Sequence, residues 1–245
     1  MKTKTLLLLL LILAMATSSV LVVKNLNSKP KKIKVDWSMR KLKKVPPKFK
    51  ISLRSTSYSP DVFKVKNMAK RRDVIVIGQI VKISNYLASK LSAPISHPLY
   101  NQPMVYRDIA VAIEEVVKGK VNQPFLTARV YGGKLSEEQQ VDIGQDAAEF
   151  KQDEKVILFL YEPDKGGNVE DGVPHFNLWS AAYTKFAIIG NEAVRGPYEL
   201  PLPAIEKQKE DERDRPLSNP APMGLSVDER RFPLDKILAE IKANL

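Results

Sequence analysis

Apolar and polar positions follow a strand-like pattern through the middle of the chain. Short runs rich in Val and Ile are bounded by glycine, proline and lysine turns, which is typical of β-strands packed in a core. The runs cover residues 73–83, 104–117, 125–131, 155–161, 176–179, 182–189 and 192–195. Because helical segments do not alternate with them, we expect a mainly β fold of five to seven strands, arranged as an antiparallel OB-like barrel or a sandwich.

Glycine marks several of the breaks between these strands. Gly78 predicts a bend within the first run, residues 118–120 predict a turn, and the glycines at 132–133 end the third run. Residues 87–102 are predicted to form a loop. Residues 141–154 are polar and are predicted to make a surface excursion.

Two helices are expected beside the strands. Residues 63–72 predict a short helix with one apolar side. That side is formed by Val65, Met68 and Ala69. Residues 233–245 predict an amphipathic helix with a longer apolar stripe. The stripe consists of Leu234, Ile237, Leu238, Ile241 and Leu245. We expect this helix to dock on the β-fold, and the alternative is a helix that binds a partner protein.

The first 23 residues predict a membrane-targeting segment. Two lysines precede an unbroken aliphatic run at residues 6–13, and residues 14–16 match the A-x-A pattern after which signal peptidases cut. Residues 20–23 are apolar again, so the stretch is also long enough to span a bilayer as an uncleaved helix. A signal peptide and a membrane anchor both fit. If the helix is not cleaved, the lysines after it favour a cytosolic location for the rest of the chain. The short leucine core and the A-x-A pattern favour export, which is the outcome we expect.

Charge is distributed unevenly along the chain. The net charge is +11, but residues 24–72 contain 17 Lys and Arg against two acids, for +15. Lys2 and Lys4 add +2, so residues 73–245 carry −6. The basic segment is either a solvated spacer or lies against an anionic lipid or an acidic cell-wall polymer, where each cation contributes about 1 kcal/mol. Nucleic acid is not expected as a partner, because the segment has only four aromatic residues at no regular spacing.

These patterns divide the chain into five parts, of which the fourth is too rich in proline and charge to bury a face. The parts are a signal peptide or membrane anchor (1–23), a basic linker (24–60), a β-domain (61–196), a Pro-rich charged linker (197–232) and the C-terminal helix (233–245).

Residue types that most catalytic sites need are missing or isolated. The chain has no cysteine, which excludes disulfides, thiolate metal sites and a cysteine nucleophile. His97 and His175 stand alone, and two isolated histidines without a carboxylate cluster make a poor metal site. Glu114 and Glu115 are neighbours on a predicted strand, so they point to opposite faces and cannot act as an acid–base pair.

The remaining motif matches are weak. Two Ser-x-x-Lys matches, at 28–31 and 38–41, lie in a lysine-rich segment that gives no reason for a lysine to be buried and deprotonated. Asp164, Glu170 and Asp171 flank a glycine-rich loop but lack the spacing of a calcium-binding EF-hand. Neither a phosphate-binding glycine loop nor a nucleophile elbow is present. We therefore expect no enzyme activity and no catalytic, cofactor-binding or metal-binding residues.

Four segments of the β-domain carry a resemblance to known proteins. In order they read DVIVIGQIV (73–81), AVAIEEVVKG (110–119), ARVYGG (128–133) and DEKVILFL (153–160). This series resembles a loosely defined group of uncharacterised exported prokaryotic proteins and, more weakly, netrin-like and TIMP-like domains, which are OB-like barrels. The resemblance covers about residues 73–195 and implies a fold, because its motifs are strand cores and turns. TIMP-like inhibitors act through a disulfide-pinned N-terminal cysteine, which this chain lacks, so that activity is not implied.

These observations predict an exported or membrane-anchored, extracytoplasmic and non-catalytic β-barrel protein that presents a binding surface at the cell envelope. Its expected partners are the membrane, through residues 1–23, an anionic lipid or wall polymer, through residues 24–72, and an unidentified protein. Two alternatives remain. One is a hydrolase-type enzyme with His97, His175 and carboxylates in the barrel mouth, and the other is binding of nucleic acid or an anionic polymer through the basic linker.

Overall fold

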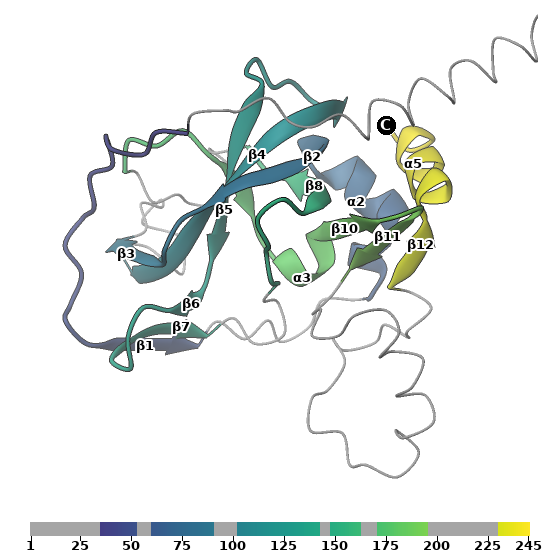
Figure 1. The fold of residues 1–245 in the computed structure, drawn as a ribbon. Helices are drawn as coiled ribbons and strands as arrows, with labels where there is room; N and C mark the ends of the chain where they lie inside the picture. Colours follow the sequence, from purple (N-terminus) through teal and green to yellow (C-terminus); the bar gives the residue numbers. More distant parts are fainter. Residues whose placement is uncertain (1–34, 53–59, 91–101, 143–147, 163–170, 196–229) are drawn as a thin grey trace, which may run out of the picture. The chain divides into compact units, whose positions relative to one another are not determined.

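The structure, a computed structural model, describes six stretches of the chain (Figure 1). They are residues 35–52, 60–90, 102–142, 148–162, 171–195 and 230–245. The predicted targeting segment, the first part of the basic linker and most of the Pro-rich linker lie outside the described residues. Within those six stretches, no helix combines the length and the apolar character needed to cross a membrane.

The described elements are mostly β-strands, as the sequence predicts, but the described residues form twelve strands and not the expected five to seven. The strands are β1 (Phe49–Ser52), β2 (Val74–Ile83), β3 (Leu87–Lys90), β4 (Pro103–Lys118), β5 (Phe125–Tyr131), β6 (Gly133–Lys134), β7 (Gln139–Asp142), β8 (Lys155–Leu160), β9 (Phe176–Leu178), β10 (Lys185–Ile189), β11 (Glu192–Arg195) and β12 (Arg231–Pro233). The helices are η1 (Pro60–Phe63, a 3₁₀ turn), α2 (Val65–Arg71), α3 (Ala181–Thr184) and α5 (Leu234–Lys242).

The strands form two sheets whose topology corrects the predicted antiparallel barrel. The larger sheet has the order β12-β11-β10-β8-β2-β4-β5-β9, with β3 paired to β4, and the smaller has the order β1-β7-β6. Among the described residues the larger ladder is open, with β12 and β9 at its ends. Both sheets are mixed, because β5 pairs with β9 and β1 pairs with β7 in parallel. Parallel pairs join strands separated by long crossovers, which local periodicity does not reveal.

One isolated bridge brings the two sides of the larger sheet together. Tyr161, which directly follows β8, exchanges both backbone hydrogen bonds with Asn177 of β9, at 3.0 and 2.9 Å. The strands β8, β2, β4, β5 and β9 therefore come round towards one another, and this bridge joins the two ends of that five-strand series.

The pairing of β2 with β4 confirms the bend predicted at Gly78. The register between the two strands shifts three times, once between Ile77 and Gly78. Such irregularities bend a strand and increase its twist. A Cβ atom at Gly78 would lie 2.2 Å from the carbonyl oxygen of Ala112, so the close approach of the two backbones requires glycine here.

Both faces of β2 are buried, which explains why its sequence is a continuous apolar run. Val74 and Val76 belong to the main core, while Ile75 and Ile77 on the opposite face are no more than 1% exposed. The main core also takes apolar side chains from β4, β5 and β8. These are Ile109, Val111, Leu126, Ala128, Val130, Val156, Leu158 and Leu160.

Both predicted helices are present. In α2, Val65, Met68 and Ala69 are buried as expected. The stripe of α5 buries Ile237 and Ile241 and packs beside α2, β11 and β12 (Figure 1), whereas Leu245 is 57% exposed. The predicted hairpin is also confirmed, because β10 and β11 pair antiparallel around a turn at Gly190.

Three expectations about local structure need correction. The strand predicted at 182–189 begins only at Lys185, whereas Ala181–Thr184 forms the short helix α3. Residues 87–102 were expected as a loop, yet Leu87–Lys90 forms β3 against the start of β4, and residues 91–101 lie outside the described residues. The predicted surface excursion at 141–154 begins with the last two residues of β7, and its Val141 and Phe150 are buried at 1% and 7% exposure. Isolated apolar residues in a polar segment fold inward here because neighbouring strands offer apolar surface, which the local pattern does not show.

Candidate functional site

A buried ion pair lies at the centre of the larger sheet. Asp108 of β4 and Arg129 of β5 are directly opposite each other in the antiparallel register, and both side chains are fully buried. Arg129 Nε donates to Asp108 Oδ1 at 2.7 Å, and Arg129 Nη2 donates to Asp108 Oδ2 at 2.8 Å. This is the bidentate geometry in which guanidinium and carboxylate interact most strongly. Burial opposes the charge on Arg129, but the carboxylates of Asp108 and Asp171 raise its pKa above the ordinary value.

Asp171 is the second carboxylate that binds Arg129. Its Oδ2 accepts hydrogen bonds from Arg129 Nη2 at 2.8 Å and from the Tyr106 hydroxyl at 2.7 Å, and its Oδ1 accepts from the backbone N–H of Val173 at 3.1 Å. Burial alone would raise the pKa of Asp171, but Arg129, the Tyr106 hydroxyl and the Val173 amide together hold it below its ordinary value. A lowered pKa means that Asp171 supports folding above the ordinary aspartate pKa and loses this contribution as the pH falls through the lowered value.

A second guanidinium comes from a segment that the sequence analysis placed in the basic linker. Arg40 Nη2 bonds to Asp108 Oδ2, and Arg40 Nε donates to Asp171 Oδ2 at 3.1 Å. The Arg40 side chain is 11% exposed, and its guanidinium carbon lies 5.4 Å from the ring centre of Trp37. Two carboxylates and two guanidiniums thus balance in charge, which reduces the cost of burying them. We call Asp108, Arg129, Asp171, Tyr106 and Arg40 the ion cluster.

Residues 35–48, which we call the strap, are fastened to the β-domain on both sides of Arg40. Before it, Lys82 Nζ of β2 donates to the carbonyl of Val35 at 3.0 Å. The backbone N–H of Lys41 donates to the carbonyl of Asp171 at 2.8 Å, and that of Lys43 donates to Ser89 Oγ of β3 at 2.9 Å. Further along, the side-chain amide of Gln139 donates to the carbonyl of Pro46 at 2.9 Å. The strap then continues into β1, so the part of the predicted linker from residue 35 to 52 belongs structurally to the β-domain.

The strap also covers a second, smaller core. Val45 of the strap and Phe49 and Ile51 of β1 pack against a buried cluster. Its members are Ala88, Met104, Val105, Tyr106, Tyr131 and Val141. The apolar residues at 45, 49 and 51 indicate, within a lysine-rich sequence, a segment that packs on the domain. Residues 49 and 51 are two positions apart, which is the spacing of side chains on one face of a strand.

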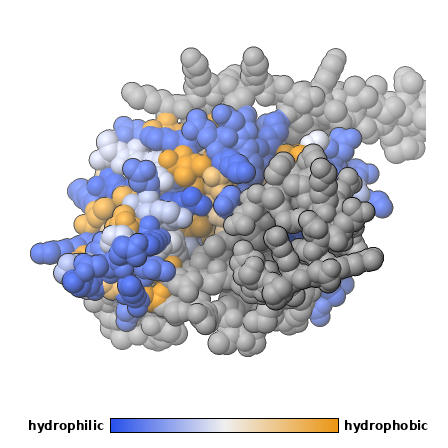
Figure 2. All heavy atoms as spheres, turned by 60° about the horizontal axis from the view of Figure 1, so that its bottom comes forward, coloured by the Kyte–Doolittle hydropathy of each residue, from blue (hydrophilic) through white to orange (hydrophobic). Residues whose placement is uncertain are grey.

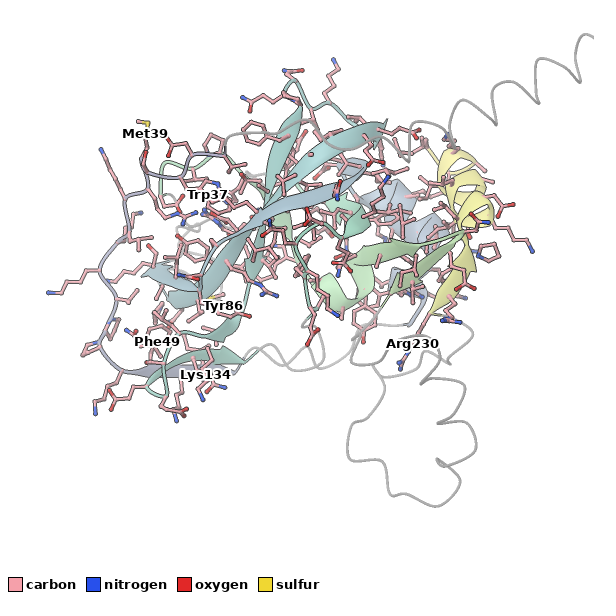
Figure 3. All side chains as sticks on the ribbon, in the orientation of Figure 1. Trp37, Met39, Phe49, Tyr86, Lys134 and Arg230 are labelled. Carbon is pink, nitrogen blue, oxygen red and sulfur yellow. The ribbon has the colours of Figure 1, made fainter. Side chains whose placement is uncertain are left out.

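The outward side of the strap is basic and carries exposed apolar side chains. Lys41, Lys43 and Lys44 are exposed, as is Lys48 near its end. Met39 is 79% exposed and lies at the outer edge of the strap, close to Trp37 (Figure 3), and Leu42 is 46% exposed. One face of the molecule shows hydrophobic residues interleaved with hydrophilic ones (Figure 2). The ion cluster therefore holds the inner side of the strap against the domain, while the lysines, Met39 and Leu42 on its outer side are exposed.

His175, one of the two histidines considered for chemistry, lies buried beside the ion cluster. Its Nδ1–H donates to the carbonyl of Val173 at 2.7 Å, and no described residue hydrogen-bonds its Nε2. Burial, followed by the positive charge of Arg129, lowers the pKa of His175. His97 lies outside the described residues. In the described stretches no group of three His, Asp or Glu side chains is placed to hold a metal ion.

We expect the stability of the folded chain to decrease as the pH falls below the ordinary histidine pKa of about 6.5. The folded state keeps His175 neutral there, while the unfolded chain takes up the proton, so unfolding becomes easier. Urea unfolding midpoints at pH 7.5 and pH 5.5 measure the effect. His175→Gln should reduce the difference between the two midpoints. A difference as large as that of the unchanged chain would contradict this account.

The other residues considered for chemistry have separate partners. Glu114 binds Lys155 at 3.0 Å and Glu115 binds Lys242 of α5 at 3.4 Å, so the two adjacent carboxylates do not act on one point. Asp171 belongs to the ion cluster, whereas Asp164 and Glu170 lie outside the described residues. Ser38 is exposed, and its backbone N–H donates to the Asp36 carboxylate at 2.8 Å.

A second ion pair, between buried Lys185 and partly buried Glu154, joins β10 to the segment before β8. Lys185 Nζ lies 2.7 Å from Glu154 Oε2 and 2.5 Å from the carbonyl oxygen of Glu149. Burial lowers the pKa of Lys185, and the carboxylate of Glu154 opposes that change. Lys185 therefore binds groups of its own chain, as the charged side chains of the ion cluster do.

Sequence reasoning missed the ion cluster, although a signal for part of it was present. Asp108 and Arg129 each interrupt an otherwise apolar strand, and a charged residue inside a buried strand needs a partner of opposite charge. Arg40 gave no such signal, because it is one cation among many in the basic segment.

Comparison with known proteins gives no family for this chain. A scan of protein-family models returned no match, and a search of curated proteins found no similar sequence. The function is therefore inferred from the chain's own residues.

Proposed function

We propose that this chain is a non-catalytic β-domain, exported or anchored by residues 1–23, that presents a binding surface at the cell envelope. The observation that carries the proposal is the position of the strap. Arg40 holds it on the domain, and only residues 24–34 separate the strap from the targeting segment. Eleven extended residues span about 40 Å at most, so an anchored domain would stay close to the bilayer.

The charge of this connection agrees with a position near a membrane or wall. Residues 24–34 contain five lysines and no acid, and the strap continues the basic run with exposed lysines. Cationic segments beside a membrane span are attracted to anionic headgroups. The buried charges of the ion cluster are engaged with one another, which is what a structural role in holding the strap requires.

The relation to OB-like proteins is part of the same proposal. It is supported by the coiled arrangement in which long β4 pairs with β2, β3 and β5, and by the bridge between Tyr161 and Asn177. OB-like domains bind ligands through one sheet face and its bordering loops. We place the binding surface on the side of the domain that carries the strap.

N-terminal sequencing of the native protein, combined with cell fractionation, tests this proposal. A mature start near Thr17 and recovery outside the cytoplasm would indicate a cleaved signal peptide, and an intact Met1 in the membrane fraction would indicate an anchor. A reporter fused to residues 1–35 should follow the same route. Leu9→Arg should abolish that targeting, because a charge at the centre of an apolar span costs about 3 kcal/mol. A reporter left in the cytoplasm by the unchanged leader would refute the proposal.

A further inference from the structure

We propose that the outward side of the strap is a lipid-binding surface that takes an anionic bilayer as its partner. In this arrangement Met39 and Leu42 enter the membrane interface while the neighbouring lysines contact headgroups. The inference rests on the proposed function, since the targeting segment is what brings the domain to a membrane. It goes further by naming the surface, the lipid class and the residues that make contact.

Two exposed apolar side chains lie within four residues of each other. Met39 and Leu42 are 79% and 46% exposed, and both belong to the strap. A single exposed apolar residue is ordinary on a protein surface. Two of them interleaved with lysines form the combination by which peripheral segments bind bilayers, where apolar burial and attraction to anionic lipid act together.

The charge of the strap and β1 selects an anionic surface. Five lysines are exposed, and Asp36 is the exposed acid among them, which leaves a net charge of +4. These lysines are Lys41, Lys43, Lys44, Lys48 and Lys50. One lysine near an anionic membrane strengthens binding about fivefold. Residues 73–245 carry a net negative charge, so an anionic bilayer would attract the strap and repel the rest of the domain.

The ion cluster makes this surface rigid before any lipid is bound. Arg40 lies between Met39 and Lys41, and its guanidinium is held by Asp108 and Asp171. The backbone N–H groups of Lys41 and Lys43 are also bonded to the domain. The side chains that face outward are therefore displayed on an ordered backbone, which lowers the entropy cost of binding.

Site-specific fluorescence on the full chain tests the inference, because the chain has no cysteine and each introduced one is unique. Met39→Cys and Leu42→Cys each receive a small environment-sensitive fluorophore. Ile189→Cys is the matched control, since Ile189 is also apolar and 38% exposed but lies at the β10–β11 turn. Each labelled chain is incorporated through its own leader into vesicles of phosphatidylcholine, with or without phosphatidylglycerol, that contain a lipid-bound quencher.

We expect quenching at positions 39 and 42 to be several-fold stronger in the anionic vesicles than in the neutral ones. Quenching at position 189 should be weak in both. Replacing Lys41, Lys43 and Lys44 with Glu should remove the difference at position 39. Circular dichroism and the unfolding midpoint show whether each variant is folded, and the Ile189 control shows that labelling itself does not cause membrane contact.

Three results would overturn the inference. Equal quenching at positions 39 and 189, or no dependence on anionic lipid, would show that the strap does not face the bilayer. A response of the position 39 probe to soluble polyphosphate as large as its response to lipid would identify a polymer partner instead. In these cases chains still float with the vesicles, so the proposed function stands. Chains that fail to float with either vesicle would count against the leader, and so against the proposed function.

Discussion

Replacing Arg129 with Ala should lower the free energy of unfolding by about 3–5 kcal/mol, the cost of breaking a buried ion pair. The substitution removes three of the hydrogen bonds that satisfy Asp108 and Asp171 and leaves both carboxylates buried. Most domains are stable by only about 5–15 kcal/mol, so the variant should lose a large part of its stability. Urea unfolding followed by circular dichroism measures the change.

Two comparisons make this prediction specific. Arg231→Ala removes a partly exposed arginine whose distance to Glu192 is 3.8 Å, and it should change stability by less than about 0.5 kcal/mol. Removing Asp108 together with Arg129, as Asp108→Ala and Arg129→Ala, should cost less than the sum of the single changes, with a coupling of about 2 kcal/mol. Strictly additive costs would show that the two side chains do not depend on each other.

The second large effect is expected at Gly78 of β2. A Cβ atom there would lie 2.2 Å from the Ala112 carbonyl oxygen and 2.7 Å from Val111 Cγ1, both on the paired strand β4. The first of these atoms belongs to the backbone, so the two strands must separate to admit a methyl group. Gly78→Ala should therefore lower the free energy of unfolding by about 3 kcal/mol, which is the upper part of the usual cost of overpacking.

Gly190→Ala is the matched control for this change. Gly190 has a φ of +58° at the β10–β11 turn, and a Cβ atom there would meet nothing within 4 Å. Its substitution should cost only about 1 kcal/mol, from the left-handed backbone conformation alone. Thermal or urea unfolding of both variants compares the two costs. If both alanine variants had the same midpoint, the close contact between β2 and β4 would not limit stability.

Elements with strong local patterns were predictable because their periodicity does not depend on distant partners. Val65, Met68 and Ala69 identified α2, and Ile237 and Ile241 identified α5. The apolar runs also identified β2, β4, β5 and β8, since strands buried in a core need continuous or alternating apolar side chains. The surface excursion predicted at residues 141–154 was wrong for Phe150, which is buried, because one apolar residue in a polar segment carries no periodicity.

The candidate site was harder to predict. Asp108 and Arg129 become partners because the β4–β5 register places them opposite each other. A shift of one residue would turn one of them to the other face of the sheet. The sequence shows His175 as a titratable residue. Its burial beside Arg129, and with it the direction of its pKa shift, follows from the fold.

The sequence by itself determined the apolar run near the N-terminus, the basic run that follows it, the absence of cysteine chemistry and the presence of a β-rich body. These properties depend on composition and on patterns within a few residues of each other. The tertiary structure alone decided that the basic run joins the domain, because Arg40 reaches an aspartate 68 positions away. It also decided the parallel pairings and the open order of the sheet. Such contacts depend on how distant segments meet, and burial of charge then favours the one arrangement in which each carboxylate meets a guanidinium.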